Sequence, residues 1–265
     1  MFVEASAVRP QGPGRWQADI ATGWDILAAV DGGYLLAVAA RALQQETGRE
    51  PVSITGHYLT PGRAGPATVA TSIIKEGSRF TTGTCGLEQN GRAVLSLLGT
   101  FGELVERPDI LLQDAAPPDL PAPDSLPRLL PIAGQPMPPP FTERIDVRLH
   151  PHDARFAIGE PSGSARMRAY WRLLDDEPVD GIALLLAADS LPPTTFNSGL
   201  AVAWTPTLEL TVHVRARPRP GWLRLDYRTR FISHGRLEID GLIWDADDQL
   251  VAQSRQLALV PQQPA

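Results

Sequence analysis

Cysteine and lysine are almost missing from this chain of 265 residues. Cys85 is the only cysteine, so no disulfide can form within the chain, and an oxidising compartment would add no stability. Lys75 is the only lysine among 24 basic residues, the others being arginine. The 30 acidic residues outnumber the 24 basic ones, which gives a formal charge of −6. This charge argues against a nucleic-acid-binding protein, because such proteins normally carry a basic face.

Long apolar runs and common catalytic motifs are also missing. The longest apolar runs cover residues 34–40 and 182–188, well short of the roughly 20 residues that cross a bilayer. We see no signal peptide at the start and expect a cytoplasmic location without membrane attachment. The sequence has no Gly-x-Ser-x-Gly elbow, no Walker lysine and no histidine pair with metal-ligand spacing. We therefore expect neither a serine hydrolase nor a metal site.

Proline gathers in the middle of the chain. Residues 104–140 hold eleven of the 26 prolines, a density that sustains neither a helix nor a central strand. Arg128 is the only charged residue between positions 125 and 140. These shifts predict a semi-rigid linker over residues 106–140, between an N-terminal unit of residues 1–105 and a C-terminal unit of residues 141–265.

The N-terminal unit shows the pattern of one buried helix and several strands. An almost continuous Ala- and Leu-rich run at 34–43 predicts the helix, which Asp31 can cap and Gly48 can end. Turn residues separate the strand-like runs, which cover residues 16–24, 52–59, 67–75, 79–88 and 93–101. These elements predict an α+β unit in which an antiparallel sheet wraps the helix.

The C-terminal unit repeats this order. Asp180-Gly181 opens a second buried helix at 182–188. The predicted strands cover residues 141–149, 165–173, 205–214, 222–231, 236–244 and 249–260. Laid over each other without a gap, residues 79–90 match residues 236–247 in turn position. The shared order and helix character predict an internal duplication.

Gln256 stands out within the last predicted strand. It shares a face with small or apolar residues, where its amide would be costly unless it found partners. It is therefore either part of a buried polar network or a site residue. The same overlay places Gly99 at the equivalent position of the first copy, so the polar side chain belongs to one copy only.

Short motifs, in their order and spacing, resemble the double-hotdog acyl-CoA thioesterases, specifically the acyl-CoA thioesterase II-like group. Those of the N-terminal unit are Gly32-Gly33, Tyr58-Leu59-Thr60-Pro61-Gly62, Gly77-Ser78-Arg79-Phe80 and Gln89-Asn90-Gly91. Those of the C-terminal unit are Ala188-Asp189, Thr207-Leu208-Glu209, Val251-Ala252 and Gln256. The resemblance covers almost the whole chain apart from the linker. It implies a double hotdog, two tandem units each with a long central helix wrapped by an antiparallel sheet.

The resemblance also implies an active site of Asp, Thr and Gln in the second hotdog, working without a covalent intermediate. Asp189, Thr207 and Gln256 match these three residues. The family usually shows Asp-His just after the threonine, where this chain has Glu209-Leu210, so Thr205 stays open as the alternative to Thr207.

Gly32 and Gly33 are the candidates for substrate binding and for holding the oxyanion. Backbone N–H groups at a helix start attract negative charge, and glycine permits close approach. Paired hotdogs usually build a site between one half and the other, which is why residues of the first helix are considered for a site in the second unit.

The implied reaction is hydrolysis of a fatty acyl-CoA thioester to free acid and CoA by activated-water attack, an enzyme activity of lipid metabolism. No cofactor is expected, and the expected partners are the acyl-CoA substrate and further copies of the chain in a homo-oligomer. Two alternatives stay open: a non-catalytic acyl-CoA-binding or assembly module, and a hotdog hydratase or dehydratase. The second generally uses an Asp/His pair, and no histidine lies near Asp189 in sequence.

Overall fold

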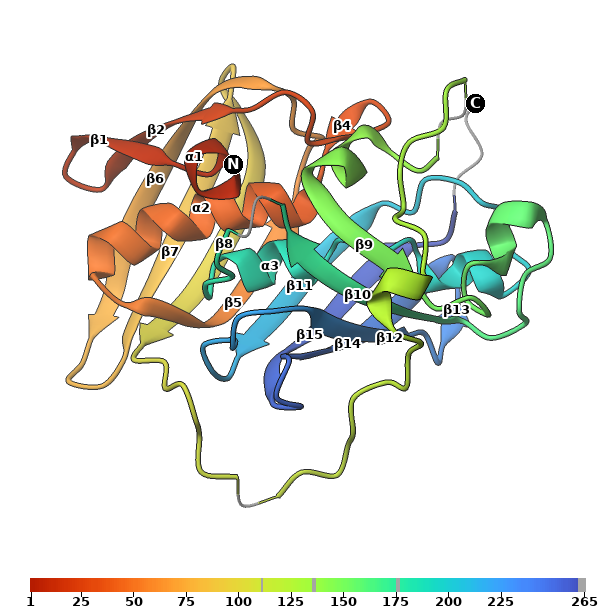
Figure 1. Cartoon of the computed structure of the whole chain (residues 1–265). Coiled ribbons are helices and arrows are strands. Elements are labelled where there is room, and N and C mark those ends of the chain that lie inside the picture. Colours follow the sequence, from red (N-terminus) through yellow and green to blue (C-terminus); the bar gives the residue numbers. More distant parts are fainter. Residues whose placement is uncertain (111, 135–136, 175–176, 262–265) are drawn as a thin grey trace.

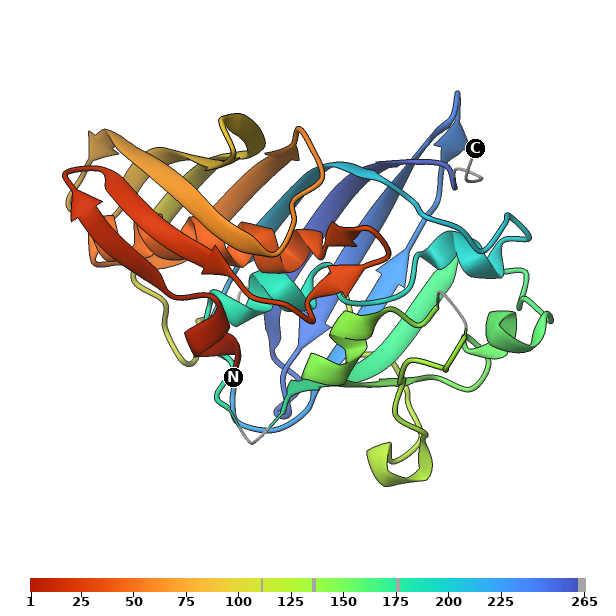
Figure 2. The ribbon, with the colours of Figure 1, turned by 90° about the horizontal axis from the view of Figure 1, so that it is seen from above.

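One antiparallel sheet runs through both halves of the molecule. The structure is a computed structural model that describes residues 1–110, 112–134, 137–174 and 177–261. Thirteen strands of these residues form the sheet, in the order β1-β2-β6-β7-β8-β5-β11-β15-β14-β12-β10-β9, with β13 paired to β14 (Figures 1 and 2). The two halves join where β5 pairs with β11, with Ile54 opposite Val212. The predicted pair of α+β units therefore shares a continuous sheet.

The N-terminal unit wraps its sheet around α2 (Gly32–Thr47). The Asp31 side chain caps this helix by accepting a hydrogen bond from the Tyr34 N–H at 2.8 Å, and Gly48 ends it with a φ of 63°. Short elements precede α2: α1 (Phe2–Ala5), β3 (Asp25–Ile26) and β4 (Ala29–Val30). The sheet strands of this unit are β1 (Val8–Gly12), β2 (Arg15–Ile20), β5 (Glu50–Tyr58), β6 (Gly65–Glu76), β7 (Thr81–Gln89) and β8 (Arg92–Gly102).

The C-terminal unit has a much shorter helix than the family resemblance implied. Its helix α3 (Ala183–Ala187) spans 5 residues against the 16 of α2, so the expectation of a long central helix in each unit fails for the second. Pro192 and Pro193 follow closely, and proline cannot continue a helix because it lacks the N–H and clashes with the preceding turn. The strands are β9 (Ile145–Leu149), β10 (Arg166–Leu173), β11 (Thr207–Val214), β12 (Leu223–Arg228), β13 (Ile232–Ser233), β14 (Arg236–Trp244) and β15 (Leu250–Leu259).

The gapless sequence match pairs the hairpin β7–β8 with the hairpin β14–β15. It holds for the second strands, β8 and β15, and fails for the first, β7 and β14. Strands β7 and β8 pair as far as Gln89 and Arg92, whereas β14 and β15 pair only as far as Trp244 and Leu250. The longer second turn shifts β14 by one residue. Gly83 is consequently buried, whereas Asp240, which the gapless match places at the equivalent position, points outward and forms an ion pair with Arg255.

The proline-rich segment between β8 and β9 contains no strand among its described residues. It leaves β8 as a long loop and returns along the C-terminal unit (Figure 1). It holds the short 3-10 helix η1 (Pro123–Ser125) and ends in η2 (Pro140–Arg144), so β9 starts later than the strand predicted from residue 141. The Leu129 N–H donates to the Val147 carbonyl at 2.8 Å, which fastens the segment to β9.

Candidate active site

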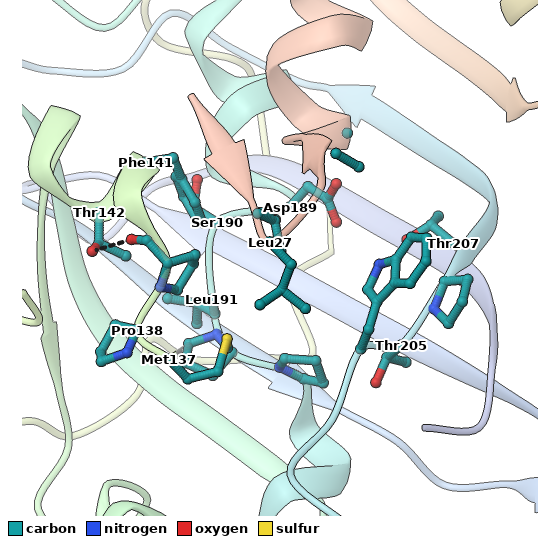
Figure 3. Close-up of a pocket in the computed structure, with 18 of the residues that line it drawn as sticks. Leu27, Met137, Pro138, Phe141, Thr142, Asp189, Ser190, Leu191, Thr205 and Thr207 are labelled. Carbon is teal, nitrogen blue, oxygen red and sulfur yellow. Dashed lines mark hydrogen bonds between the residues drawn. The ribbon is translucent and has the colours of Figure 1, made fainter. Parts of the chain in front are cut away.

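A cavity of about 1450 Å³ opens where the two units meet. It exceeds the range of about 300–1,000 Å³ that is usual for small-molecule sites. Its walls are mostly apolar and come from both units and from the linker (Figure 3). The lining stretches include residues 26–30, 58–63, 128–132, 137–139, 189–193 and 202–208.

Asp189 lies in the wall of this cavity, two residues after α3, and points toward the start of α2 (Figure 3). A Cβ atom added to Gly32 would lie 2.6 Å from Asp189 Oδ2, and one added to Gly33 would lie 2.8 Å from Asp189 Cβ. Only glycine at both positions allows this approach. The carboxylate of the second unit therefore faces the N-terminus of the first unit's helix, where the helix dipole stabilises negative charge.

Gln256 connects Asp189 to Thr207. Its Nε2 donates hydrogen bonds to Asp189 Oδ1 at 2.9 Å and to Thr207 Oγ1 at 2.5 Å. Gln256 faces inward because its neighbours across the sheet, Leu210 and Ile239, are both buried. The half-buried Gln256 amide therefore finds its hydrogen-bond partners in the side chains of Asp189 and Thr207.

The two candidate threonines occupy different environments. Thr207 is the first residue of β11 and receives the Gln256 hydrogen bond. Thr205 also lines the cavity, but its hydroxyl donates to the Ala203 carbonyl at 3.3 Å. The structure thus brings Asp189, Thr207 and Gln256 together, whereas the Thr205 hydroxyl is bonded to the backbone.

The two candidate glycines differ in access. Gly32 lines the cavity, and as the first residue of α2 it has an N–H without an intrahelical acceptor. Gly33 is buried, and its N–H forms a hydrogen bond to the Asp189 carboxyl group. Gly32 can therefore meet a ligand, whereas Gly33 holds Asp189.

Burial dominates the electrostatics of the site. It raises the pKa of Asp189 to about 7, while the hydrogen bonds from Gly33 and Gln256 act in the opposite direction. The pKa values of Asp31, Tyr58 and Tyr227 are also raised, first by burial and second by the charge of Asp189. Asp189 thus titrates near neutral pH, where a general base is most effective.

Three of these residues were not singled out for the site from the sequence. Tyr58 donates to the Gly32 carbonyl at 2.9 Å, and Tyr227 donates to the Ala187 carbonyl, so the two hydroxyl groups hold the ends of α2 and α3. Tyr58 belongs to one of the motifs that carried the resemblance, whereas nothing in the sequence marks Tyr227. Asp31 was expected only as a helix cap. Within the described part of the chain, no group of three or more His, Cys, Asp or Glu side chains is placed to hold a metal ion.

Two family models match the chain in tandem. Residues 20–102 match the acyl-CoA thioesterase N-terminal domain, and residues 114–260 match the acyl-CoA thioesterase C-terminal domain. The chain belongs to the acyl-CoA thioesterase family. The family resemblance seen in the sequence is thereby confirmed. In the described residues of this family member, no helix is long and apolar enough to span a bilayer.

Similar structures confirm the hotdog fold of this acyl-CoA thioesterase family member. The chain is 32% identical to a candidate thioesterase II from Thermobifida fusca YX, with a TM-score of 0.88 and coverage of 98% of this chain and 97% of that one. A hot dog fold protein from Alicyclobacillus acidocaldarius is 22% identical, with a TM-score of 0.87 and coverage of 100% and 98%. An uncharacterised protein of Mycobacterium tuberculosis H37Rv is 28% identical over 99% of both chains.

Proposed function

We propose that this protein hydrolyses a fatty acyl-CoA thioester to the free acid and CoA, and that Asp189 is the general base. The observation that carries the proposal is the hydrogen-bonded group of Asp189, Gln256 and Thr207 in the wall of a large apolar cavity, facing the start of α2. Thioester hydrolysis needs an activated water and a place for negative charge on the carbonyl oxygen. This arrangement offers both.

The water is activated by Asp189. Gln256 Nε2 donates to Asp189 Oδ1 and to Thr207 Oγ1, which leaves Asp189 Oδ2 and the Thr207 hydroxyl proton for a water in the cavity. Asp189 takes a proton from this water as its oxygen attacks the thioester carbonyl carbon. The tetrahedral intermediate then collapses, the C–S bond breaks, and the departing thiolate receives the proton from Asp189. Thr207 fits this role better than Thr205 because it shares the Gln256 amide.

The oxyanion is proposed to form beside the Gly32 N–H. Gly32 lines the cavity next to Asp189, and the dipole of the 16-residue helix favours negative charge at this end. Gly33 acts indirectly, since its N–H orients the Asp189 carboxyl group.

The acyl chain is proposed to occupy the apolar part of the cavity. The linker contributes to its wall through residues 128–132 and 137–139, and Leu130 and Ile132 are 45% and 52% exposed there. Exposed apolar side chains at the edge of a cavity are typical of ligand-binding grooves. We therefore assign the linker a part in substrate binding beyond connecting the units.

The test is hydrolysis of acyl-CoA substrates of increasing chain length, with Asp189→Ala and Gln256→Ala beside the wild type. We expect both substitutions to abolish most turnover. Gln253→Ala is the matched control because Gln253 lies on the outer face of the same strand and accepts a hydrogen bond from Arg215. Turnover that survives both Asp189→Ala and Gln256→Ala would show that the site is wrong.

The two alternatives predict other results. A wild-type protein that binds acyl-CoA without hydrolysing it would be a binding or assembly module. A hydratase or dehydratase would convert an enoyl or 3-hydroxyacyl thioester instead. Against this class, none of the described residues that line the cavity is a histidine. The domain boundaries, the cytoplasmic location and the homo-oligomer stay predictions, and sedimentation equilibrium tests the last.

A further inference from the structure

Asp31 and Asp180 each accept a hydrogen bond from the N–H three residues later, near the starts of α2 and α3, but they differ in what surrounds them. Asp31 Oδ1 accepts the Tyr34 N–H at 2.8 Å, and Asp180 Oδ1 accepts the Ala183 N–H at 2.7 Å. The Asp180 side chain is 38% exposed, and its Oδ2 lies 3.6 Å from Arg41 Nη1. Asp31 is 0% exposed, and its Oδ2 is buried without a hydrogen-bond partner. The Ala183 N–H and Arg41 account for both oxygens of Asp180, whereas Asp31 Oδ2 has no such partner.

Asp31 lies near enough to Asp189 for the charge of Asp189 to raise its pKa. The Gly33 N–H acts on the carboxyl groups of both residues and lowers the pKa of each. Gly32, which directly follows Asp31, approaches Asp189 Oδ2 so closely that a Cβ atom on Gly32 would lie 2.6 Å from this oxygen. Only Gly32 and Gly33, at the start of α2, therefore lie between the carboxyl groups of Asp31 and Asp189.

The other titratable groups that face this pair carry no positive charge. They are Tyr58 of β5 and Tyr227 of β12, whose hydroxyl groups donate to backbone carbonyls. No basic side chain acts on Asp31 or Asp189 in the described part of the chain. Ionisation of both the buried Asp31 and the half-buried Asp189 is unfavourable without a cation, because desolvation and mutual repulsion each oppose the second charge.

Their surroundings decide which of the two ionises. Asp189 borders the cavity and accepts a hydrogen bond from the Gln256 amide, and both features favour its charged form. Asp31 has no contact with solvent, and one of its oxygens has no donor. The charge therefore belongs to Asp189.

We propose that Asp31 is a positioning residue of the proposed hydrolysis, and that it stays a neutral carboxylic acid while Asp189 is the ionised base. In the neutral form it still caps α2 through Oδ1 and keeps Gly32 and Gly33 against Asp189. It leaves the site with one negative charge, so the start of α2 can stabilise the oxyanion. Ionisation of Asp31 would put a second charge at that place and lower the rate. Activity is then confined between the ionisation of Asp189 and that of Asp31.

The direct test is infrared spectroscopy of the carbonyl band of protonated carboxylic acids, recorded well above pH 7. Wild type and Asp180→Asn are expected to show this band, with its shift in heavy water, and Asp31→Asn is expected to lack it. Asn keeps the Oδ1 acceptor of the cap, so Asp31→Asn preserves the helix. A wild-type protein without the band contradicts the proposal whether or not the variant folds, as does a band that persists in folded Asp31→Asn.

The second test is the pH dependence of kcat/KM. Asp31→Asn is expected to move the alkaline limb up by about one pH unit or more, or to remove it, because the amide does not ionise. Asp180→Asn should leave the profile unchanged, since Asp180 lies near the start of α3 and outside the cavity lining. Superimposable alkaline limbs for wild type and Asp31→Asn would overturn the proposal. An inactive wild type would refute the proposed function alone, because the infrared test needs no turnover.

Discussion

Gln256 Nε2 lies 2.9 Å from Asp189 Oδ1, so the last strand of the chain holds a carboxyl group 67 residues earlier. The carboxyl group in turn lies against the first unit's helix at Gly32. The group of polar side chains therefore belongs to the second unit, while the surface that it faces belongs to the first. Five predictions follow from this arrangement of the two units and the linker.

The first concerns the donor role of Gln256. Its hydrogen bond lowers the pKa of Asp189, so Gln256→Glu should raise that pKa by removing the donor and adding a like charge. We expect the acidic limb of the kcat/KM profile to move to higher pH, with partial recovery of activity there. Gln256→Ala should lose activity at every pH, by about 100-fold or more. Parallel profiles for the two variants would argue against this role.

The second concerns the pH dependence of the wild type. Burial raises the pKa of Asp189 to about 7, and a general base works only when ionised. We expect kcat/KM to rise with pH and to reach half of its plateau near pH 7. Steady-state kinetics in buffers of constant ionic strength measure this directly. A profile that is flat down to about pH 5 would mean that Asp189 is not the base.

The third concerns stability. The pKa of Asp189 is about 7 in the folded chain and about 4 in the unfolded chain, so the unfolded state loses its proton first as pH rises. The free energy of unfolding should therefore fall between about pH 4 and about pH 7, by at most about 4 kcal/mol. Asp189→Asn should reduce this decline and be more stable than wild type at neutral pH. Urea unfolding across this range measures both effects, and equal pH slopes would contradict the expectation.

The fourth concerns the glycine at the start of α2. Gly32→Ala would bring a Cβ to within 2.6 Å of Asp189 Oδ2, so the carboxyl group must move away. We expect kcat to fall by about 10-fold or more with little loss of thermal stability, since Ala is a better helix former than Gly. Gly181→Ala is the control. Its Cβ would lie 3.1 Å from Pro51 Cγ, away from the site, and should not change kcat.

The fifth concerns the linker. Ile132 lines the cavity, whereas Leu112 is 86% exposed and lies outside the lining. Ile132→Ala should raise KM about fivefold or more for acyl chains long enough to contact it, because each buried methylene contributes about 0.8 kcal/mol. Short acyl chains should be unaffected. The control Leu112→Ala should leave the whole chain-length series unchanged, and an identical series for Ile132→Ala would remove the linker from the site.

Much of the fold could be read from local patterns. The apolar run at 34–43 became α2, and the strand-like runs after it became β5 to β8, because periodicity and turn residues report backbone preferences directly. The predicted boundaries of strands and turns were wrong where the local sequence pattern was ambiguous. Residues 141–144 have the composition of a strand but form η2, and the turn after β14 is longer than the overlay assumed.

The sequence by itself determined the two α+β copies, the proline-rich connection and the residue types of the candidate site. Only the tertiary structure decided that α3 is short, that Thr207 rather than Thr205 meets Gln256, and that Asp31 is buried beside Asp189. The physical reason is that residue types and spacing fix local conformation. Burial, shared hydrogen bonds and shifted pKa values arise from contacts between residues far apart in the chain, and these exist only once the two units have packed together.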